Sequence, residues 1–325
     1  MKAAVVLPME AGANASRAAE LNELLEANVK YLNSLELWLV GPERLPNKIP
    51  TLTPAPSRMK LLATDRPHQP EAVLHLLQQV QQRSPADLLL FPGGGWGAEL
   101  CTRLAFRLEG SAALDVKKLT IQSRKVNIQR PAYGNNLMAE IVLEQPPYCL
   151  SVARRSLPPA PWVNPNLRSL AIPPLEALPL DWVLESEYRP IPADGGLKDA
   201  EVVLAVGQGV GSRSNLARLK SVAEALGAEI GITRQVAMNG WGDLQRLIGI
   251  SGHILAPRIC LVAGASGAGG FRIGVQNSRF LVAINRDLRA PIFQIADVGI
   301  VGDLMPVLLE LAKILKAVGE GHKES

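Results

Sequence analysis

Short apolar runs alternate with helix-like segments along the first part of the chain. Residues 3–8 (AAVVLP) are an apolar run that predicts a buried strand, and residues 16–32 repeat leucine at helical spacing. The alternation continues through a strand at 35–41, a helix at 71–82, a strand and glycine turn at 86–97, and a helix at 98–110. Near-continuous apolar strands separated by helices predict a parallel sheet that is covered on both faces.

The same alternation restarts near residue 199. Residues 199–211 (DAEVVLAVGQGVG) predict a strand that runs into a glycine turn, and residues 214–231 predict a helix followed by a strand. Further strands are expected at 258–264 and 279–285, a short strand within 290–304, and a closing amphipathic helix at 303–319. This half of the chain therefore predicts a second α/β unit.

A proline-rich stretch separates the two patterns. Residues 146–192 contain 11 of the 25 prolines, and proline is disfavoured in helix interiors and central strands. We expect a connector or a set of edge strands here, ending in a boundary at 192–200. A chain of 325 residues also exceeds the usual size of a single core. The expected fold is therefore α/β, with two doubly wound, mostly parallel-sheet domains at 1–192 and 197–325, joined by the proline-rich connector.

Composition limits the classes of function. The chain is 47% hydrophobic, but it has no run of about 18 uncharged apolar residues that would predict a membrane-spanning helix. Its apolar start is too short for an export signal. Three widely spaced cysteines and four scattered histidines argue against disulfides and metal sites, and for a reducing cytoplasm. Dispersed basic residues and an aromatic content of 4% argue against a nucleic-acid surface.

Two glycine-rich segments follow predicted strands. Residues 207–212 (GQGVGS) lie between a strand and a helix, where glycines let the backbone approach a phosphate and the helix N-terminus offers free N–H groups. Residues 264–274 (GASGAGGFRIG) form a second glycine-rich loop after a strand. Each segment on its own is compatible with a cofactor loop and with a plain turn.

Several polar residues lie near the ends of predicted strands. Arg234 suits an anion or a flavin ring, although a solvated surface arginine gives the same sequence signal. Asp303 suits either a helix cap or a ribose contact. Ser251 lies in a glycine-rich segment, but a nucleophilic serine needs a base and an orienting acid, and no GxSxG motif is present. A hydrolase is therefore not expected.

The C-terminal half carries an ordered set of motifs: DAEVVLAVGQG, SNLARLKSVAEALGAEIGITR, GASGA and FLVAINRDLRAPIFQIADVGIVGDL. Together they resemble the α-subunit of electron-transfer flavoproteins, closely over residues 197–315. The first half is more loosely similar, through FPGGGWGAELCTRLAFRLEG at 91–110 and RPAYGNNLMAEIV at 130–142. Nearly the whole chain is therefore covered by the resemblance.

This resemblance implies a heterodimer of an α- and a β-subunit. The α-subunit supplies a first, partner-facing domain and most of a second domain that binds FAD. The resemblance implies an electron carrier that takes electrons from a dehydrogenase and passes them to a downstream acceptor oxidoreductase, usually at a membrane. We expect no substrate chemistry, catalytic residue or metal of the chain itself, and a cytoplasmic protein without direct membrane insertion.

The resemblance also implies which residues bind FAD. Thr233 takes the position of a serine that touches the FAD phosphates. Arg234 takes that of an arginine near the isoalloxazine ring, and Ser251 that of a threonine near flavin N5, so these two are expected to tune the ring. The other expected contacts come from the loops: Gly249, Ser266, Gly267, Ala268 and Gly269 around the cofactor, and Asn285, Asp303 and Leu304 toward the adenosine end.

Four further cofactor positions depart from the family pattern. Gln208 replaces an arginine, Ile250 and Gly270 replace glutamines, and Phe271 replaces a histidine that lies near flavin O2. A positive partner there favours the anionic reduced ring, and Phe271 cannot provide it. We expect FAD to be retained with a lower reduction potential, and Arg234 to carry most of the stabilisation of an anionic semiquinone.

Two alternatives remain open at this point. A partner-binding scaffold that has lost its cofactor fits the substitutions at Gln208, Ile250 and Phe271. A nicotinamide-dependent oxidoreductase fits GQGVGS and Asp303, but the GxGxxG fingerprint and its acidic residue about 20 positions later are absent. A visible absorption spectrum of the protein purified with its β-subunit separates these possibilities.

Overall fold

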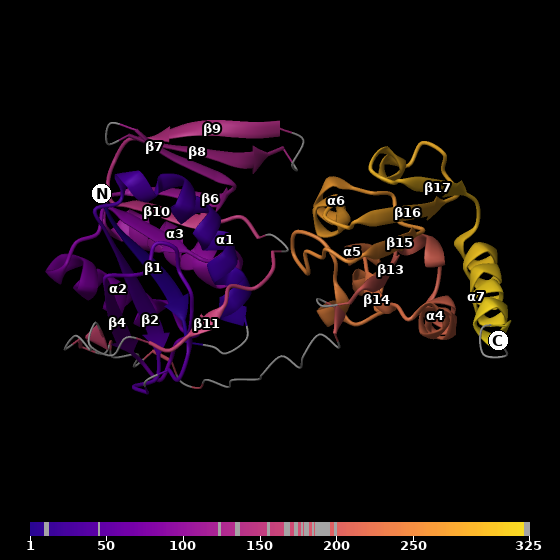
Figure 1. The fold of residues 1–325 in the computed structure, drawn as a ribbon, viewed down its shortest axis with the longest axis horizontal. Helices are drawn as coiled ribbons and strands as arrows, with labels where there is room; N and C mark the ends of the chain where they lie inside the picture. The colour runs from indigo at the N-terminus through magenta and orange to yellow at the C-terminus, as the bar shows by residue number, and fades with distance from the viewer. Residues whose placement is uncertain are drawn as a thin grey trace. The chain divides into compact units, whose positions relative to one another are not determined.

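The computed structural model describes residues 1–9, 13–44, 46–122, 125–133, 137–154, 157–165, 170–171, 175–176, 178, 182–183, 185, 196–197 and 200–321. It divides into two compact units, Met1–Glu187 (the first unit) and Tyr188–Ser325 (the second unit), shown in Figure 1. Each unit is built around its own sheet and its own apolar clusters.

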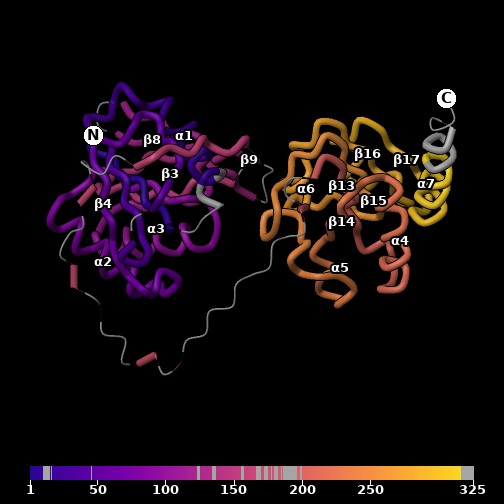
Figure 2. Tube along the Cα trace, turned by 60° about the horizontal axis from the view of Figure 1, so that its bottom comes forward, coloured from indigo at the N-terminus to yellow at the C-terminus, as the bar shows by residue number. Residues whose placement is uncertain are grey.

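The first unit has a seven-stranded, all-parallel sheet in the order β12-β4-β2-β1-β5-β10-β6. Helix α1 packs on one face of this sheet, and α2 and α3 pack on the other, as Figure 2 shows. The predicted elements of this half are confirmed, whereas β4 and β6 were not predicted. The bounds are Lys2–Pro8 (β1), Ala13–Asn28 (α1), Ser34–Gly41 (β2), Arg58–Ala63 (β4), Pro70–Arg83 (α2), Leu88–Phe91 (β5), Gly95–Arg107 (α3), Ser111–Val116 (β6), Tyr148–Val152 (β10) and Leu170–Ala171 (β12).

A three-stranded antiparallel sheet covers part of the α1 face. It consists of β7 (Lys118–Gln122), β8 (Lys125–Ala132) and β9 (Leu137–Leu143), with β8 in the middle. Val126 and Ile128 of β8 are buried in the same apolar cluster as α1. These strands mix apolar and polar residues because only one face is buried, and they were not among the predicted elements.

The expectation of a connector or edge strands over 146–192 is wrong for part of that stretch. Tyr148–Val152 (β10) is a central strand, paired with β5 on one side and β6 on the other, and all five of its residues are buried. The prolines flank this strand at positions 146–147 and 158–159 and none lies inside it, so its ladder of N–H donors is complete. Farther along, β11 (Trp162–Val163), which pairs antiparallel with β3 (Ile49–Pro50), and β12 are two-residue strands.

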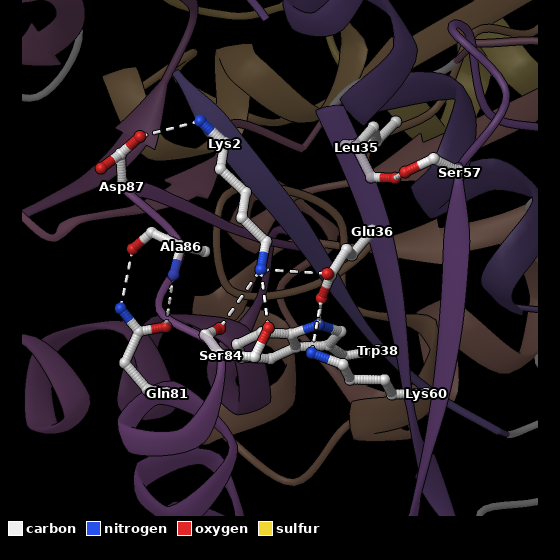
Figure 3. A network of polar contacts seen from close by, with 10 residues as sticks. All are labelled: Lys2, Leu35, Glu36, Trp38, Ser57, Lys60, Gln81, Ser84, Ala86 and Asp87. Carbon is white, nitrogen blue, oxygen red and sulfur yellow. Dashed lines mark hydrogen bonds and ion pairs between the residues drawn. The ribbon is translucent and has the colours of Figure 1, made fainter. Parts of the chain in front are cut away.

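A buried ion network joins three strands of the first unit (Figure 3). Glu36 of β2 is 2% exposed. Its Oε1 lies 3.0 Å from Nζ of Lys2 on β1, and its Oε2 lies 2.7 Å from Nζ of Lys60 on β4. The indole N–H of Trp38 donates to the same Oε2 at 2.8 Å. Each strand therefore contributes a charge that has its partner on a neighbouring strand.

The second unit has a five-stranded, all-parallel sheet in the order β14-β13-β15-β16-β17 (Figure 1). Helices α4 and α7 pack on one face and α6 on the other. The chain runs from β13 to β14 on one side and then crosses to β15 on the other, which places a topological switch point between β13 and β15. The bounds are Val202–Val206 (β13), Arg213–Leu226 (α4), Glu229–Ile232 (β14), Arg234–Met238 (α5), Ile259–Ala263 (β15), Gly269–Val275 (α6), Phe280–Asn285 (β16), Val298–Val301 (β17) and Leu304–Gly321 (α7).

The predicted strands of this half and its closing helix are confirmed, with one correction. Residues 264–274 were expected to be a loop, but helix α6 begins at Gly269. Phe271, Ile273 and Val275 of this helix are buried. Burial of these apolar side chains outweighs the low helix propensity of glycine.

Candidate functional site

The expected cofactor residues gather at one edge of the second unit's sheet. Because all five strands are parallel, their carboxyl ends share one edge, and ligands of open α/β sheets bind there beside the switch point. The residues concerned follow β13, β14, β15 and β17, and Asn285 is the last residue of β16. The segment 249–251 joins them because Ile248 donates its N–H to the carbonyl of Ile232 at the end of β14 (2.9 Å). We call this region the carboxyl edge: residues 207–209, 233–234, 249–251, 264–271, 285 and 302–304.

Glycines let two loops of the carboxyl edge pack backbone against backbone. The N–H of Gly207 donates to the carbonyl of Ala263 at 2.8 Å, and that of Gly209 to the carbonyl of Gly264 at 2.9 Å. A Cβ on Gly207 would lie 2.4 Å from the carbonyl oxygen of Gly264, so no side chain fits. Gly264 and Gly267 adopt φ values of 67° and 83°, which favour glycine. The two glycine-rich segments therefore form a shaped backbone surface.

Thr233 is the buried polar side chain of the carboxyl edge. The residue is 5% exposed, and its Oγ1 has no hydrogen-bond partner among the described residues. A buried hydroxyl without a partner costs about 1–3 kcal/mol, so such groups need an explanation. A ligand oxygen at this position would satisfy the hydroxyl.

Arg234 and Ser251 lie side by side. The guanidinium Nη2 of Arg234 donates to Oγ of Ser251, and both side chains are exposed. The backbone of the two residues before Ser251 is constrained. Gly249 adopts a φ of 124°, and the N–H of Ile250 donates to the carbonyl of Gly270 at 2.8 Å.

The positions that depart from the family pattern differ in exposure. Phe271 is 9% exposed and packs in the apolar cluster on the α6 face. Ile250 is 52% exposed, and Gln208 is also exposed. At the start of the second glycine-rich segment, Ser266 and Ala268 are exposed, whereas Gly267 is buried. Of the side chains of Gln208, Ile250 and Phe271, that of Phe271 alone is buried.

The side chain of Asn285 makes hydrogen bonds to two loops of the carboxyl edge. Its Nδ2 donates to the carbonyl of Ala265 at 2.9 Å, and its Oδ1 accepts from the N–H of Asp287 at 3.0 Å. Its backbone carbonyl accepts from the N–H of Gly302 at 3.0 Å. The side chain therefore connects the loops that follow β15 and β16.

Asp303 caps helix α7. Its Oδ1 accepts from the N–H of Met305 at 3.0 Å, and its Oδ2 pairs with the guanidinium of Arg286. The Met305 N–H first, and Arg286 second, lower the pKa of Asp303. Leu304 is 3% exposed and its side chain belongs to the core. Arg286 was not singled out from the sequence; the available signal was a basic residue at the end of β16 beside an acidic one after β17.

Comparisons with known proteins bear on this site. Residues 196–276 match the electron transfer flavoprotein FAD-binding domain, and residues 61–178 match the electron transfer flavoprotein domain. YgcQ of Escherichia coli K12, named as an electron transfer flavoprotein subunit, is 44% identical over 248 residues, which cover 76% of this chain and 85% of YgcQ. The chain belongs to the electron-transfer flavoprotein α-subunit family.

Two further relatives of this α-subunit differ in length. FixB of Escherichia coli is 30% identical over 241 residues, which cover 73% of this chain and 76% of FixB. LctC of Acetobacterium woodii, named as a subunit of an NAD⁺- and ferredoxin-dependent lactate dehydrogenase, is 32% identical over 275 residues. That match covers 82% of this chain but 65% of LctC, so this α-subunit spans slightly less than two thirds of that relative.

FAD is the cofactor of this α-subunit, in place of the nicotinamide alternative. The carboxyl edge fits FAD in three respects. Its second glycine-rich segment lets a diphosphate approach the main chain, and the Oγ1 of Thr233 in the same region has no hydrogen-bond partner among the described residues. Arg234 adds a cation at the end of β14, where it suits the negative charge of a reduced flavin.

Proposed function

We propose that this chain is the α-subunit of a heterodimeric electron carrier, and that FAD lies along the carboxyl edge. The observation that carries the placement is Thr233, a buried hydroxyl without a partner among the described residues, beside two glycine-rich backbone loops. When bound, FAD supplies the chemistry by taking up and releasing one or two electrons. The chain supplies the position and the electrostatic environment of the cofactor.

Each proposed residue has a separate task at the carboxyl edge. Thr233 donates its hydroxyl to an FAD phosphate, and the backbone at 207–209 and 264–268 surrounds the cofactor. Arg234, held in place by Ser251, stabilises negative charge on the flavin ring. Asn285 and Asp303 shape the adenosine end, Asn285 by bracing Ala265 and Asp303 by capping α7.

The first unit offers a surface for the β-subunit. Strand β9 is an edge strand, and four of its apolar residues are exposed: Leu137, Met138, Ile141 and Val142. An edge strand with exposed apolar side chains suits pairing with another chain. We propose that β9 contacts the β-subunit, and that a dehydrogenase and a downstream acceptor oxidoreductase dock on the assembled heterodimer.

A cytoplasmic location belongs to the same proposal. Cys101, Cys149 and Cys260 are buried and free, and burial raises the pKa of the Cys101 and Cys260 thiols to about 12. Buried thiols that are not paired as disulfides suit a reducing compartment. None of the helices within the described residues is long and apolar enough to cross a membrane.

Replacing Thr233 with valine tests the placement of FAD. Valine keeps the shape of threonine and removes a hydroxyl that has no partner among the described residues, so the apoprotein should unfold at the same temperature as wild type or a higher one. FAD affinity should fall by about tenfold or more, because a hydrogen bond to a phosphate is lost. The measurements are FAD dissociation by visible absorption and thermal unfolding, on the chain co-purified with its β-subunit.

Thr102→Val is the matched control for this substitution. Thr102 lies in the first unit, where its Oγ1 already donates to the carbonyl of Ala98 at 2.7 Å, so FAD affinity should not change. Unchanged FAD affinity in Thr233→Val would exclude Thr233 from the cofactor site. Complete absence of flavin bands from the purified wild-type heterodimer would instead support a scaffold that has lost its cofactor.

A further inference from the structure

The glycine turn of the first unit has no part in the proposed function. In that unit the chain forms β1, β2 and β4 toward one side of the sheet and then places β5 on the other side of β1. The switch point, where open α/β sheets bind ligands, therefore lies between β1 and β5. Residues 92–94 (PGG) follow β5 at this point, and helix α3 begins at Gly95.

The first turn of α3 presents main-chain N–H groups that are not used by the protein. Those of Gly95, Trp96 and Gly97 have no hydrogen-bond partner among the described residues. The N-cap is Gly94, which has no side chain to cap them, and the first turn contains no acidic residue. Because α3 is 13 residues long, its peptide dipoles add positive character at this end. A Cβ on Gly95 would meet nothing within 4 Å, so the space beside these groups is open.

A buried hydroxyl lies on the side of the sheet that α3 covers. Ser151 of β10 is 1% exposed, and its Oγ has no hydrogen-bond partner among the described residues. Ser151 pairs with Phe91 of β5, so both side chains point to the same face of the sheet. Phe91 packs in the apolar cluster that contains α2 and α3. A buried hydroxyl without a partner is costly and needs an explanation.

The side chain of Ser151 faces the first turn of α3. Farther along the helix, Sγ of Cys101 donates to the carbonyl of Cys149 on β10 at 3.1 Å. Ser151 is two residues, or about 7 Å, closer to the carboxyl end of the strand than Cys149. That distance corresponds to about four or five residues of the helix, which runs in the opposite direction. Ser151 therefore lies opposite residues 96–97, where the unused N–H groups are.

Close backbone contacts fix the shape of this turn. A Cβ on Gly93 would lie 2.5 Å from the carbonyl oxygen of Val152, the residue after Ser151, so no side chain fits. Gly94 adopts a φ of 110°, which favours glycine. The indole N–H of Trp96 donates to the carbonyl of Pro67 at 3.0 Å and holds the neighbouring loop, residues 64–69, against α3. A preformed turn reduces the ordering that a ligand imposes on binding.

The charged side chains around the start of α3 do not select a ligand by themselves. The loops 64–69 and 153–154 and the residues 95–99 carry two arginines and two carboxylates, all exposed: Arg66, Arg154, Asp65 and Glu99. Glu99 also pairs with Arg103. Preference for an anion rests instead on the three main-chain N–H groups, which accept no proton and have no carboxylate of the first turn beside them.

We propose that the start of α3 binds a phosphate group, as free phosphate or as a phosphate ester. Phosphate oxygens accept from the N–H groups of Gly95, Trp96 and Gly97, and the hydroxyl of Ser151 donates to an oxygen between the turn and β10. The site belongs to the first unit and is separate from the residues proposed to bind FAD. It does not depend on the proposed function.

Calorimetric titration of the chain co-purified with its β-subunit tests the proposal, with inorganic phosphate and ribose 5-phosphate as probes. Gly95→Asp should remove one equivalent of bound phosphate, because its carboxylate repels the anion. Its unfolding temperature should stay at or above that of wild type, because an acidic residue favours a helix N-terminus. Gly95→Ala is the matched control and should keep the equivalent. Tighter binding of ribose 5-phosphate supports an ester as the ligand, and tighter binding of inorganic phosphate supports the free ion.

Ser151→Ala is a second, independent variant. Its phosphate affinity should be about tenfold lower, because a hydrogen bond to a charged group is lost. Without phosphate, its unfolding temperature should equal that of wild type or exceed it, because no hydrogen bond within the described residues is removed. Ser57→Ala is the matched control. Ser57 lies just before β4, where its Oγ donates to the carbonyl of Leu35 at 3.0 Å, so phosphate affinity should not change.

Three results would overturn the proposal. The first is an equal number of bound equivalents in wild type and in Gly95→Asp. The second is a phosphate affinity that Ser151→Ala leaves unchanged, which would make the hydroxyl a buried group without a ligand. The third is an equal loss of affinity in Thr233→Val, which would place the probe at the carboxyl edge of the second unit. Thermal unfolding accompanies each titration, so that a misfolded variant is recognised and the other variant decides.

Discussion

Phe271 is the residue at which the family resemblance and the packing have to be considered together. It stands where the family has a histidine near the flavin, yet its ring is 9% exposed and packs in an apolar cluster. An imidazole in such surroundings is disfavoured in its charged form. A histidine here therefore stabilises a reduced flavin only if the negative charge of the ring lies close enough to offset that cost.

Phe271→His should raise FAD affinity or the flavin reduction potential, because an imidazolium favours the anionic reduced ring. It should also lower the unfolding temperature, because a polar ring replaces a buried apolar one. Retained FAD, redox potential and thermal unfolding are measured together. Phe280→His is the control, since Phe280 is 42% exposed at the start of β16. If affinity and potential both stay at wild-type values, Phe271 is not near the ring.

The sequence could place residues near strand ends but could not show how each side chain is used. Thr233 and Arg234 follow an apolar run and a glycine, which identified them as candidates. The amide of Asn285 is hydrogen-bonded within the protein. Nothing in the sequence distinguished it from an amide that is free to contact a ligand. Leu304 is likewise a core side chain that only the packing of α7 reveals.

At the scale of elements, the Glu36 network fixes the alignment of three strands. Lys2, Glu36 and Lys60 point to the same face of the sheet (Figure 3), and a shift of one residue in any strand would turn its charge to the opposite face. Burial raises the pKa of Glu36, but hydrogen bonds from Lys60, Trp38 and Lys2 outweigh it and leave the pKa below 4.5. The carboxylate is therefore charged at neutral pH.

Glu36→Gln should lower the free energy of unfolding by about 3–5 kcal/mol at pH 7, because Lys60 is left buried without its counter-charge. A carboxyl with a lowered folded-state pKa stabilises the fold above its unfolded pKa of 4.5, and that contribution is lost as the pH falls through the folded value. The difference between wild type and variant should thus shrink below pH 4.5. Urea unfolding across pH checks this, with Glu99→Gln at an exposed pair as the control.

The secondary-structure elements that could be predicted were those whose sequence has a single strong hydrophobic pattern. The parallel strands are near-continuous apolar runs, and both sheets of such strands were expected. Strand β10 was missed because the prolines around it dominate the composition of residues 146–192, although none interrupts Tyr148–Val152. The antiparallel β7–β9 sheet has one buried face, and its pairing partners are set by tertiary contacts that a local window does not contain.

At the scale of the whole molecule, the proposal that β9 contacts the β-subunit can be tested by one substitution. Val142→Lys places a charge on an exposed apolar position, 53% accessible, of this edge strand. Co-purification of the β-subunit should be lost, while the unfolding temperature of the chain should stay near that of wild type. Phe106→Lys is the control, because Phe106 is 85% exposed on α3 of the same unit. Full retention of the β-subunit by Val142→Lys would remove β9 from the interface.

The position of β10 in the sheet also has a consequence for synthesis of the chain. β10 lies between β5 and β6, although both of these precede it in sequence. During synthesis, β6 has no neighbouring strand in the sheet until β10 has been made. The position between β5 and β6 is filled when residue 152 has emerged from the ribosome. Contacts so distant in sequence slow folding. We therefore expect the nascent first unit to stay open at this side, and exposed to chaperones, until β10 inserts.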